Sequence, residues 1–157
     1  MFDVRPATFA DVDPLTILWQ ANMEERASYD RRFQLAESAV EEWRAAFHNW
    51  LQQDNVQVLV AEKEGQLIGY VIGWVLERPL FHLQQRYGFI SDLGVDGHAH
   101  QGGVGKALFN GIKPWFSQQE VGVIEIQVMH QHPIAQAFWR SRGATEYLDH
   151  FWYSLRD

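Results

Sequence analysis

The chain contains no cysteine. This absence excludes disulfide bonds, thiolate metal ligands and any cysteine nucleophile, so a group-transfer enzyme built on this chain could form no acyl-cysteine intermediate. Long apolar runs are absent too: the most apolar stretch, LIGYVIGWVL at residues 67–76, is far shorter than the ~20 residues that a membrane span needs. No basic-then-apolar leader is visible at the N-terminus. We therefore expect a cytoplasmic protein with no membrane partner.

Basic residues are few relative to acidic ones, with 13 Lys and Arg against 20 Asp and Glu and a formal net charge of −7. A net acidic chain is a poor candidate for binding nucleic acid, and it mildly favours cationic or amine partners. The length of 157 residues, with 46% hydrophobic and 21% charged residues, fits one soluble globular domain over residues 1–157. Seven tryptophans suit core packing, and a minority of them could line an apolar ligand groove.

Hydrophobic periodicity and turn residues predict an α/β fold in the order β-α-α-β-β-β-α-β-α-β, with about four helices around one mixed sheet of about six to seven strands. The predicted helices are residues 8–25, 35–53, 103–118 and 133–144. The predicted strands are residues 2–8, a hairpin over 55–76 with a Glu64-Gly65 turn, 88–95, 122–129 and 145–155. Pro114 is expected to kink or end its helix.

Glycines gather where the strand at 88–95 leads into the next helix, in the run HAHQGGVGK at residues 98–106. The first backbone N–H groups of a helix have no partner within it, and the helix dipole adds positive charge there. Glycines let a phosphate approach those groups, so this loop could hold a pyrophosphate, with Lys106 at its rim. A tight strand-to-helix connection without a ligand is the alternative.

Two common phosphate-binding motifs fit poorly. A Walker A loop needs Ser or Thr after its Gly-Lys pair and a glycine five residues before the second glycine, but Ala107 and His100 occupy those positions. The dinucleotide fingerprint G-x-G-x-x-G accommodates Gly103 and Gly105 and then meets Leu108.

A third pattern fits better. The run ISDLGVDGHAHQGGVGKALF, residues 90–109, resembles the acyl-CoA-binding motif [RQ]-x-x-G-x-[GA] of the GCN5-related N-acetyltransferase (GNAT) family, with His100 in place of Arg or Gln. HPIAQAFWRSRGA, residues 132–144, resembles that family's N-x-x-A-x-x-F-Y-x-x-x-G-F segment, with His132 for Asn, Trp139 for Tyr and Ala144 for Phe. The hairpin at 58–75 resembles its second and third strands, and the element order agrees.

This resemblance implies that acetyl-CoA is the co-substrate. A bulge at Gly94 would splay its strand from the next one, and the backbone of Leu93 and Val95 would contact the pantetheine and acyl group. The family's motif positions place further cofactor contacts at Gln101, Gly102, Gly103, Val104, Gly105, Lys106, His132 and Trp139. A simple packing role is the alternative for Gly94.

The implied reaction is direct attack of a primary amine, on a small molecule or peptide, on the acetyl thioester, with no covalent enzyme intermediate. Asp92 is the candidate general base, and a strand carboxylate that pairs with arginine or orients substrate is the alternative. Trp139 replaces the usual tyrosine acid and does not titrate usefully. Tyr87, Tyr147 and Tyr153 are possible substitutes.

Other interpretations remain open at this stage. One is a non-catalytic acyl-CoA-binding or sensing module, and another is a phosphate-ligand binder outside the family. The histidines in the pairs 98/100 and 130/132 could supply a base or lie in solvent, and we expect no metal site. The resemblance places the acceptor wall at residues 23–53 and the loop 77–87, and acidic residues there could attract a cationic substrate or be only a solvated helix face. A homodimer is plausible because many members of this family dimerise.

Overall fold

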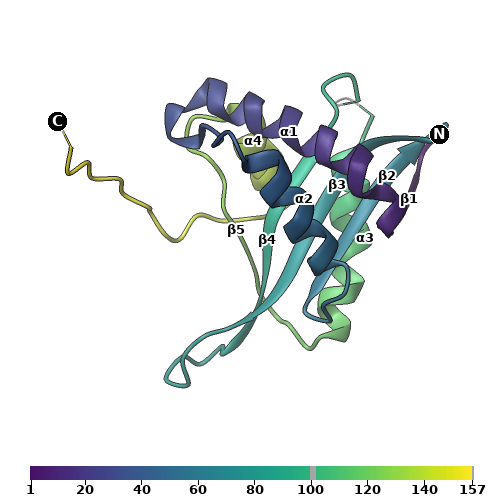
Figure 1. Ribbon diagram of the computed structural model, residues 1–157. Coiled ribbons are helices and arrows are strands. Elements are labelled where there is room, and N and C mark those ends of the chain that lie inside the picture. Colours follow the sequence, from purple (N-terminus) through teal and green to yellow (C-terminus); the bar gives the residue numbers. More distant parts are fainter. Residues whose placement is uncertain (100–101, 157) are drawn as a thin grey trace. The chain divides into compact units, whose positions relative to one another are not determined.

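A five-stranded sheet is the centre of the first of two structural units, Met1–Gln127 and Val128–Asp157. The structure is a computed structural model, and it describes residues 1–99 and 102–156. Figure 1 traces the elements of each unit.

The first unit contains the whole sheet. Strands β1 to β4 are antiparallel, and β5 lies parallel to β4 at the edge of the order β1-β2-β3-β4-β5. The elements of this unit are β1 (Asp3–Pro6), η1 (Phe9–Asp11), α1 (Val12–Tyr29), η2 (Arg31–Phe33), α2 (Ala39–Trp50), β2 (Val56–Lys63), β3 (Gln66–Glu77), β4 (Arg86–Val95), α3 (Val104–Gln118) and β5 (Ile124–Ile126). The second unit contains α4 (Pro133–Ser141).

All four predicted helices and the hairpin are confirmed. Glu64 and Gly65 both have positive φ, 52° and 79°, as a two-residue turn of type I′ requires. Pro114 does not end its helix, because α3 runs on to Gln118 and keeps Ile112 and Phe116 buried. Within residues 1–99 and 102–156, no helix is long and apolar enough to cross a membrane.

The prediction of six to seven strands was wrong, because the described residues form five. Residues 145–155 are rich in the aromatic residues that favour strands, yet they form neither strand nor helix. A β-strand exists only where its backbone N–H and C=O groups find a neighbouring strand, and the second unit contains none in its described part.

The two faces of the sheet are covered by different helices (Figure 1). Helices α1 and α2 pack against one face, where the side chains at alternate positions of β2 and β3 join a core that includes Val58, Val60, Tyr70 and Ile72. Helix α3 packs against the other face. A Cβ built on Gly73 of β3 would lie only 2.6 Å from a methyl carbon of Ile112, so glycine is what allows α3 so close to the sheet.

A one-residue bulge changes which face the side chains of β4 meet. Gly73 of β3 pairs with Ile90, but the next residue, Ile72, pairs with Asp92, so Ser91 is extra. Before the bulge, Ile90 shares the α3 face with Gly73. After it, Asp92 shares the α1 face with Ile72, although an unbroken strand would put residues 90 and 92 on the same side.

The bulge predicted at Gly94 is therefore at Ser91 instead. Gly94 pairs regularly with Tyr70, and a Cβ built on it would lie 2.5 Å from Cε1 and 2.8 Å from Cζ of that tyrosine. The packing role, which was the alternative for Gly94, is the one that the structure shows.

We expect Gly94→Ala to destabilise the protein by about 1–3 kcal/mol, because the added methyl group must displace a fully buried ring. The matched control is Gly97→Ala, whose Cβ would meet no atom within 4 Å. That control should change the free energy of unfolding by less than about 0.5 kcal/mol. Urea denaturation at a common m-value measures both, and equal effects would contradict the close packing at Gly94.

Candidate active site

Asp92 lies on the α1 face of the sheet and meets Arg26 of that helix. The Nη1 atom of Arg26 donates to Oδ1 of Asp92 at 3.3 Å, and the Asp92 side chain is 14% exposed. The contact joins β4 to the C-terminal half of α1. It exists because the bulge at Ser91 turns Asp92 toward that helix.

Burial raises the pKa of the Asp92 carboxyl above its ordinary value of 3.8. Arg26 and a hydrogen bond from the Ser91 side chain oppose this shift without cancelling it. A carboxylate with a raised pKa is a better proton acceptor than a solvated one, and such groups concentrate at active sites. The net direction indicates that removal from water dominates over the ion pair.

The bulge is itself held by a side-chain hydrogen bond. The indole Nε1 of Trp74 on β3 donates to the hydroxyl Oγ of Ser91 at 2.9 Å. The ring of Trp74 packs edge-to-face on Trp50 of α2, with centroids 5.1 Å apart. A continuous set of contacts therefore runs from α2 through Trp74 and Ser91 to Asp92.

Tyr70 is the site residue that the sequence did not reveal. It is completely buried on β3, and within the described part of the chain its hydroxyl has no hydrogen-bond partner. Burial and the nearby charge of Asp92 raise the pKa of Tyr70 well above its ordinary value of 10.0, against a smaller opposing effect of Arg26. In the run LIGYVIG, a tyrosine among apolar residues looks like core, and only the fold brings it to Asp92.

Strand β5 is short and pairs with β4 only where Gly88, Phe89 and Ile90 meet Ile124, Glu125 and Ile126. Strand β4 continues to Val95, past the last residue that pairs with β5. Leu93 and Val95, the predicted contacts of the acyl chain, lie in this segment.

The glycine loop leads into α3 as the sequence predicted. Gly103 is the N-cap in a left-handed conformation, with φ of 73°, and a Cβ built on it would meet no atom within 4 Å. The backbone N–H groups of Val104, Gly105 and Lys106 begin the helix and so have no acceptor within it. The N–H of Gly102 instead donates to the Ala99 carbonyl at 3.1 Å. Predicted residues His100 and Gln101 lie outside the described residues.

Two predicted cofactor contacts, His132 and Trp139, belong to the second unit. His132 is the N-cap of α4, where its Nδ1 accepts from the backbone N–H of Ala135 at 3.2 Å. This is the capping role that Asn usually fills at a helix start. Trp139 packs edge-to-face on Phe138, with ring centroids 5.0 Å apart. Contact of either residue with a cofactor stays a prediction.

The other histidines form no cluster where they are described. The backbone N–H of His98 donates to Asp96, and His130 lies 3.8 Å from the exposed carboxylate of Asp149. Across residues 1–99 and 102–156, no group of three or more His, Asp or Glu side chains could hold a metal ion.

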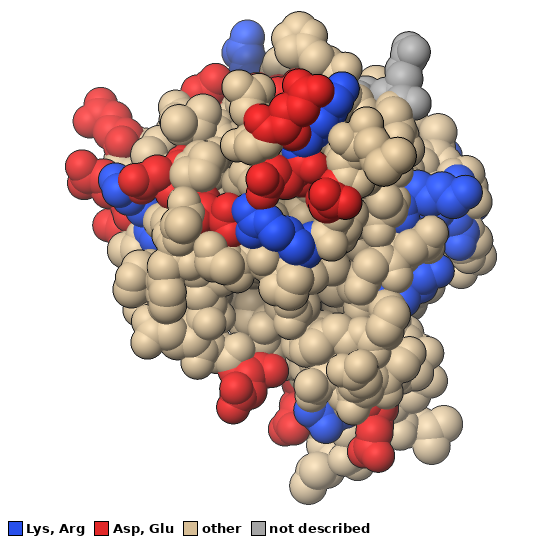
Figure 2. Space-filling view, turned by 90° about the vertical axis from the view of Figure 1, so that its right-hand side faces the viewer, with Lys and Arg blue, Asp and Glu red and all other residues tan. Residues whose placement is uncertain are grey.

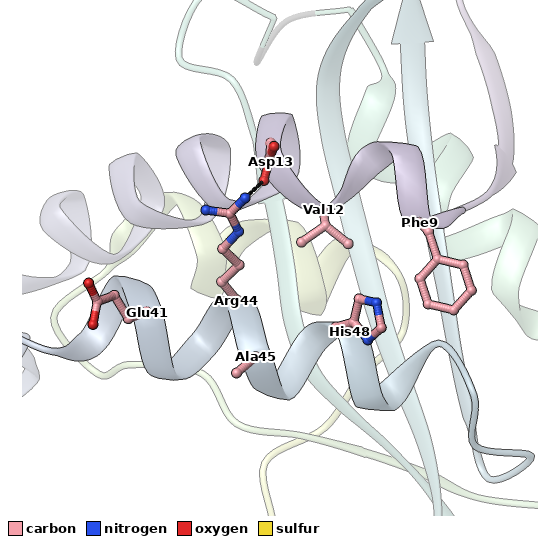
Figure 3. Close-up of a pocket in the computed structure, with 7 residues that line it drawn as sticks. All are labelled: Phe9, Val12, Asp13, Glu41, Arg44, Ala45 and His48. Atoms are coloured by element: carbon pink, nitrogen blue, oxygen red, sulfur yellow. Dashed lines mark ion pairs between the residues drawn. The ribbon is translucent and has the colours of Figure 1, made fainter.

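A groove of about 460 Å³ lies elsewhere, between the start of α1 and α2 (Figure 3). Arg44 crosses it to pair with Asp13, and the rings of Phe9 and His48 lie 4.7 Å apart at one end. Asp13 precedes Arg26 by thirteen residues of α1, about 20 Å along a helix axis. This groove is therefore separate from the region around Asp92.

The acidic residues of the predicted acceptor region are partly neutralised. Arg32 binds Asp30 through side-chain and backbone hydrogen bonds and lowers the pKa of that carboxyl to about 2. Glu24 accepts a hydrogen bond from Gln20 at 3.0 Å. The charges at Asp30 and Glu24 resemble a solvated helix surface more than a dedicated cation site. Figure 2 shows another face of the molecule, where acidic side chains gather at left, basic ones at right and both kinds at the upper centre.

The site thus combines a glycine loop that opens α3 with a strand β4 that carries Asp92 and runs past the end of β5. The family model of the "Acetyltransferase (GNAT) family" matches residues 19–144, and the chain belongs to this family. No curated protein matches the sequence.

Solved structures of similar fold agree along the whole chain. A tetramutant of the BH1408 protein from Bacillus halodurans is 22% identical with a TM-score of 0.86, covering 98% of this chain and 99% of its own. An aminoglycoside acetyltransferase from an uncultured soil metagenomic sample is 24% identical with a TM-score of 0.72, covering 99% and 97%. An aminoglycoside 6'-N-acetyltransferase from Acinetobacter haemolyticus is 17% identical with a TM-score of 0.77, covering 99% of both chains. At these identities the likeness shows the fold.

We expect Asp92→Asn to raise stability at pH 7. Because the pKa of Asp92 is higher in the folded protein, the folded state binds a proton there more readily than the unfolded chain. Its contribution to stability is complete below the ordinary pKa of about 4 and is lost as pH rises through the raised value. The gain from Asp92→Asn should shrink on acidification, and thermal unfolding between pH 4 and pH 8 measures it.

The matched control is Asp11→Asn. Asp11 is also buried, but Arg5 donates to it at 2.8 Å and, with Thr8, lowers the pKa of Asp11. Its contribution to stability is present above the ordinary pKa and is lost as pH falls through the lowered value. Asp11→Asn should therefore be less stable than the native protein at pH 7. A loss of stability in both variants would contradict the raised pKa of Asp92.

Proposed function

We propose that the protein transfers an acetyl group from acetyl-CoA directly to a primary amine of a small molecule or peptide. The observation that carries this proposal is the position of Asp92, a buried carboxylate with a raised pKa, on the segment of β4 that runs past the end of its pairing with β5. Membership of the GNAT acetyltransferase family supports the reaction class.

The residues present fit an acyl-CoA. Strand β4 runs past the end of its pairing with β5, and there the backbone of Leu93 would contact an extended pantetheine chain in the manner of an added strand; contact of Val95 with the acyl group stays a prediction. The amides of Gly103 to Lys106 at the start of α3 offer donors and partial positive charge for the pyrophosphate. Acetyl-CoA would supply an activated thioester, so the protein needs no nucleophile of its own.

The acceptor amine must lose a proton before it attacks, since an alkyl ammonium has a pKa near ~10. Asp92 is the proposed base, acting directly or through a water molecule. Its raised pKa makes the carboxylate a stronger acceptor, and Arg26 holds it in place at 3.3 Å. Without that arginine, burial would favour the protonated form still more, and less of the base would be available at neutral pH.

Tyr70 is the proposed hydrogen-bonding acid for the leaving thiolate. Its hydroxyl is protonated at neutral pH and, in the described structure, unpaired, and because its pKa is raised it would stabilise the thiolate by donating a hydrogen bond rather than by giving up its proton. Among the earlier candidates, Tyr87 instead carries the guanidinium of Arg78 over its ring at 3.9 Å. Tyr147 and Tyr153 lie in the second unit.

Two structural neighbours support an amine acceptor. Their names identify them as aminoglycoside acetyltransferases, and a further neighbour from Brucella melitensis is named as a ribosomal-protein-alanine N-acetyltransferase. Both groups of acceptor present amines, one on a small molecule and one on a peptide chain. The second candidate function is a non-catalytic acyl-CoA sensor, which the replacement of the family's tyrosine by Trp139 favours.

Calorimetric titration tests the cofactor. Acetyl-CoA should bind with a Kd in the micromolar range, whereas ATP and NADH should give no signal. Thiol release in the presence of a panel of amines then separates the enzyme from the sensor, which would bind acetyl-CoA and release no thiol. Tight binding of ATP or NADH without any acetyl-CoA signal would overturn the proposal.

We expect Asp92→Asn to lower kcat/KM at least tenfold, because the amide cannot accept the proton of the amine. In the native enzyme, the acid limb of the pH profile should lie above the ordinary Asp value of 3.8 and should vanish in the variant. The control Asp3→Asn changes an exposed carboxylate on β1 and should leave the rate unchanged.

In the same assay, Tyr70→Phe should lower kcat while acetyl-CoA binding is kept. An Asp92→Asn variant with native kcat/KM would remove the base assignment. A Tyr70→Phe variant with native kcat would remove the acid assignment.

A further inference from the structure

Trp74 is a half-buried tryptophan on β3, on the face of the sheet that α1 and α2 cover. Its indole Nε1 donates to the hydroxyl Oγ of Ser91, the extra residue of β4, at 2.9 Å. Packing alone would need only an apolar ring at this position, whereas the indole N–H adds a hydrogen-bond donor. The contact therefore joins a side chain of the core to the bulge that directs Asp92 toward Arg26.

A cluster of aromatic rings holds the indole of Trp74. Trp50 of α2 packs edge-to-face on it, with ring centroids 5.1 Å apart and an interplanar angle of 81°. Trp50 in turn meets Trp43 at 6.0 Å and Phe47 at 6.5 Å. Trp43 stacks on Trp19 of α1 at 4.7 Å. Rings from both helices thus restrict the rotation of the indole, and with it the direction of its N–H group.

The Ser91 hydroxyl extends this constraint to the carboxylate. A hydroxyl has one proton to donate and two lone pairs, so Ser91 can accept from Trp74 and still donate to Asp92. Burial raises the pKa of Asp92, and a hydrogen bond from the Ser91 side chain is one of the effects that oppose this shift. A hydroxyl that accepts a hydrogen bond is polarised by it and donates more strongly.

Two other groups act on Asp92 in the described structure. Burial and the charge of Asp92 together raise the pKa of Tyr70 on β3, so these two residues are electrostatically coupled. Arg26 of α1 donates to Oδ1 of Asp92 at 3.3 Å, longer than the roughly 2.7–2.9 Å that is typical of a charge-assisted hydrogen bond. Because a single contact to one oxygen leaves a carboxylate able to rotate, a second donor is needed to fix Asp92.

We propose that Trp74 is a positioning residue for the general base. Its indole N–H fixes the Ser91 hydroxyl so that the hydroxyl proton faces the carboxylate of Asp92. This role rests on the proposed function, in which Asp92 accepts a proton from the amine. Ser91 and Arg26 then hold the carboxylate from two sides, one from the sheet and the other from α1.

We expect Trp74→Phe to shift the acid limb of the kcat/KM profile to higher pH, because the Ser91 hydroxyl is then able to turn away from Asp92. Loss of that donor removes an effect that lowers the pKa of Asp92. On the acid limb, kcat/KM should fall about threefold to tenfold, whereas at high pH it should stay within about twofold of the native value. Ser91→Ala should shift the limb in the same direction. Ser91→Thr keeps the hydroxyl and should keep the native limb.

Trp50→Phe separates this role from simple packing. It alters a ring of the same cluster and retains an aromatic ring against Trp74, but it leaves the donor to Ser91 in place. Both Trp74→Phe and Trp50→Phe should lower the free energy of unfolding, and only Trp74→Phe should move the acid limb. Equal limbs in these two variants would show that Trp74 is a packing residue alone.

A carboxyl-carbon NMR titration of aspartate-labelled protein gives a second measurement that requires no turnover, with Asp92→Asn to assign the signal. The pKa of Asp92 should be higher in Trp74→Phe and in Ser91→Ala than in the native protein. An unchanged pKa in both variants would overturn the positioning role, even if Asp92 were the base. A raised pKa together with native kcat/KM in Asp92→Asn would instead remove the base assignment, so the two failures are distinguished.

Discussion

The site depends on one extra residue in one strand. Ser91 has no counterpart on β3, and its insertion turns Asp92 from the α3 face of the sheet to the α1 face. This change of face occurs directly after Ile90, which is the last residue of β4 that pairs with β5. Trp74 secures the irregularity by donating to the Ser91 hydroxyl. The position of the carboxylate and its contact with the arginine are thus results of a single backbone feature.

The pKa of Asp92 is shifted in the opposite direction from the pKa of Asp11, the other acid with little exposure to solvent. At Asp11, hydrogen bonds from Arg5 and Thr8 outweigh the cost of burial, and the pKa of the acid falls. At Asp92, burial outweighs Arg26, and the pKa rises. Tyr70 adds a buried hydroxyl without a partner in the described structure. A fold optimised for stability alone would remove such groups or satisfy them, and their presence together is typical of a functional site.

Local sequence patterns predicted those parts of the fold that local interactions determine. The helices, the Glu64-Gly65 turn and the glycine-capped start of α3 each follow from a few neighbouring residues.

Asp92 could be proposed because of its place in a family motif. The position of the bulge could not, because it depends on the pairing of β3 with β4, and Gly94 drew attention to the wrong residue. Tyr70 and Arg26 come from distant elements, so their meeting with Asp92 is visible only in three dimensions. The strand predicted at 145–155 does not form, because a strand needs a partner strand, and the composition of one segment does not reveal whether it has one.

In β4, the face of the sheet on which each side chain lies depends on how many residues precede it. Insertions and deletions therefore change that face, whereas substitutions do not. A substitution at position 91 keeps the number of residues, although a side chain without the hydroxyl would lose the hydrogen bond from Trp74. Losing that residue, or gaining one between Gly88 and Asp92, would exchange the two faces for everything that follows. Over evolutionary time, this short stretch should therefore accept substitutions and reject insertions and deletions.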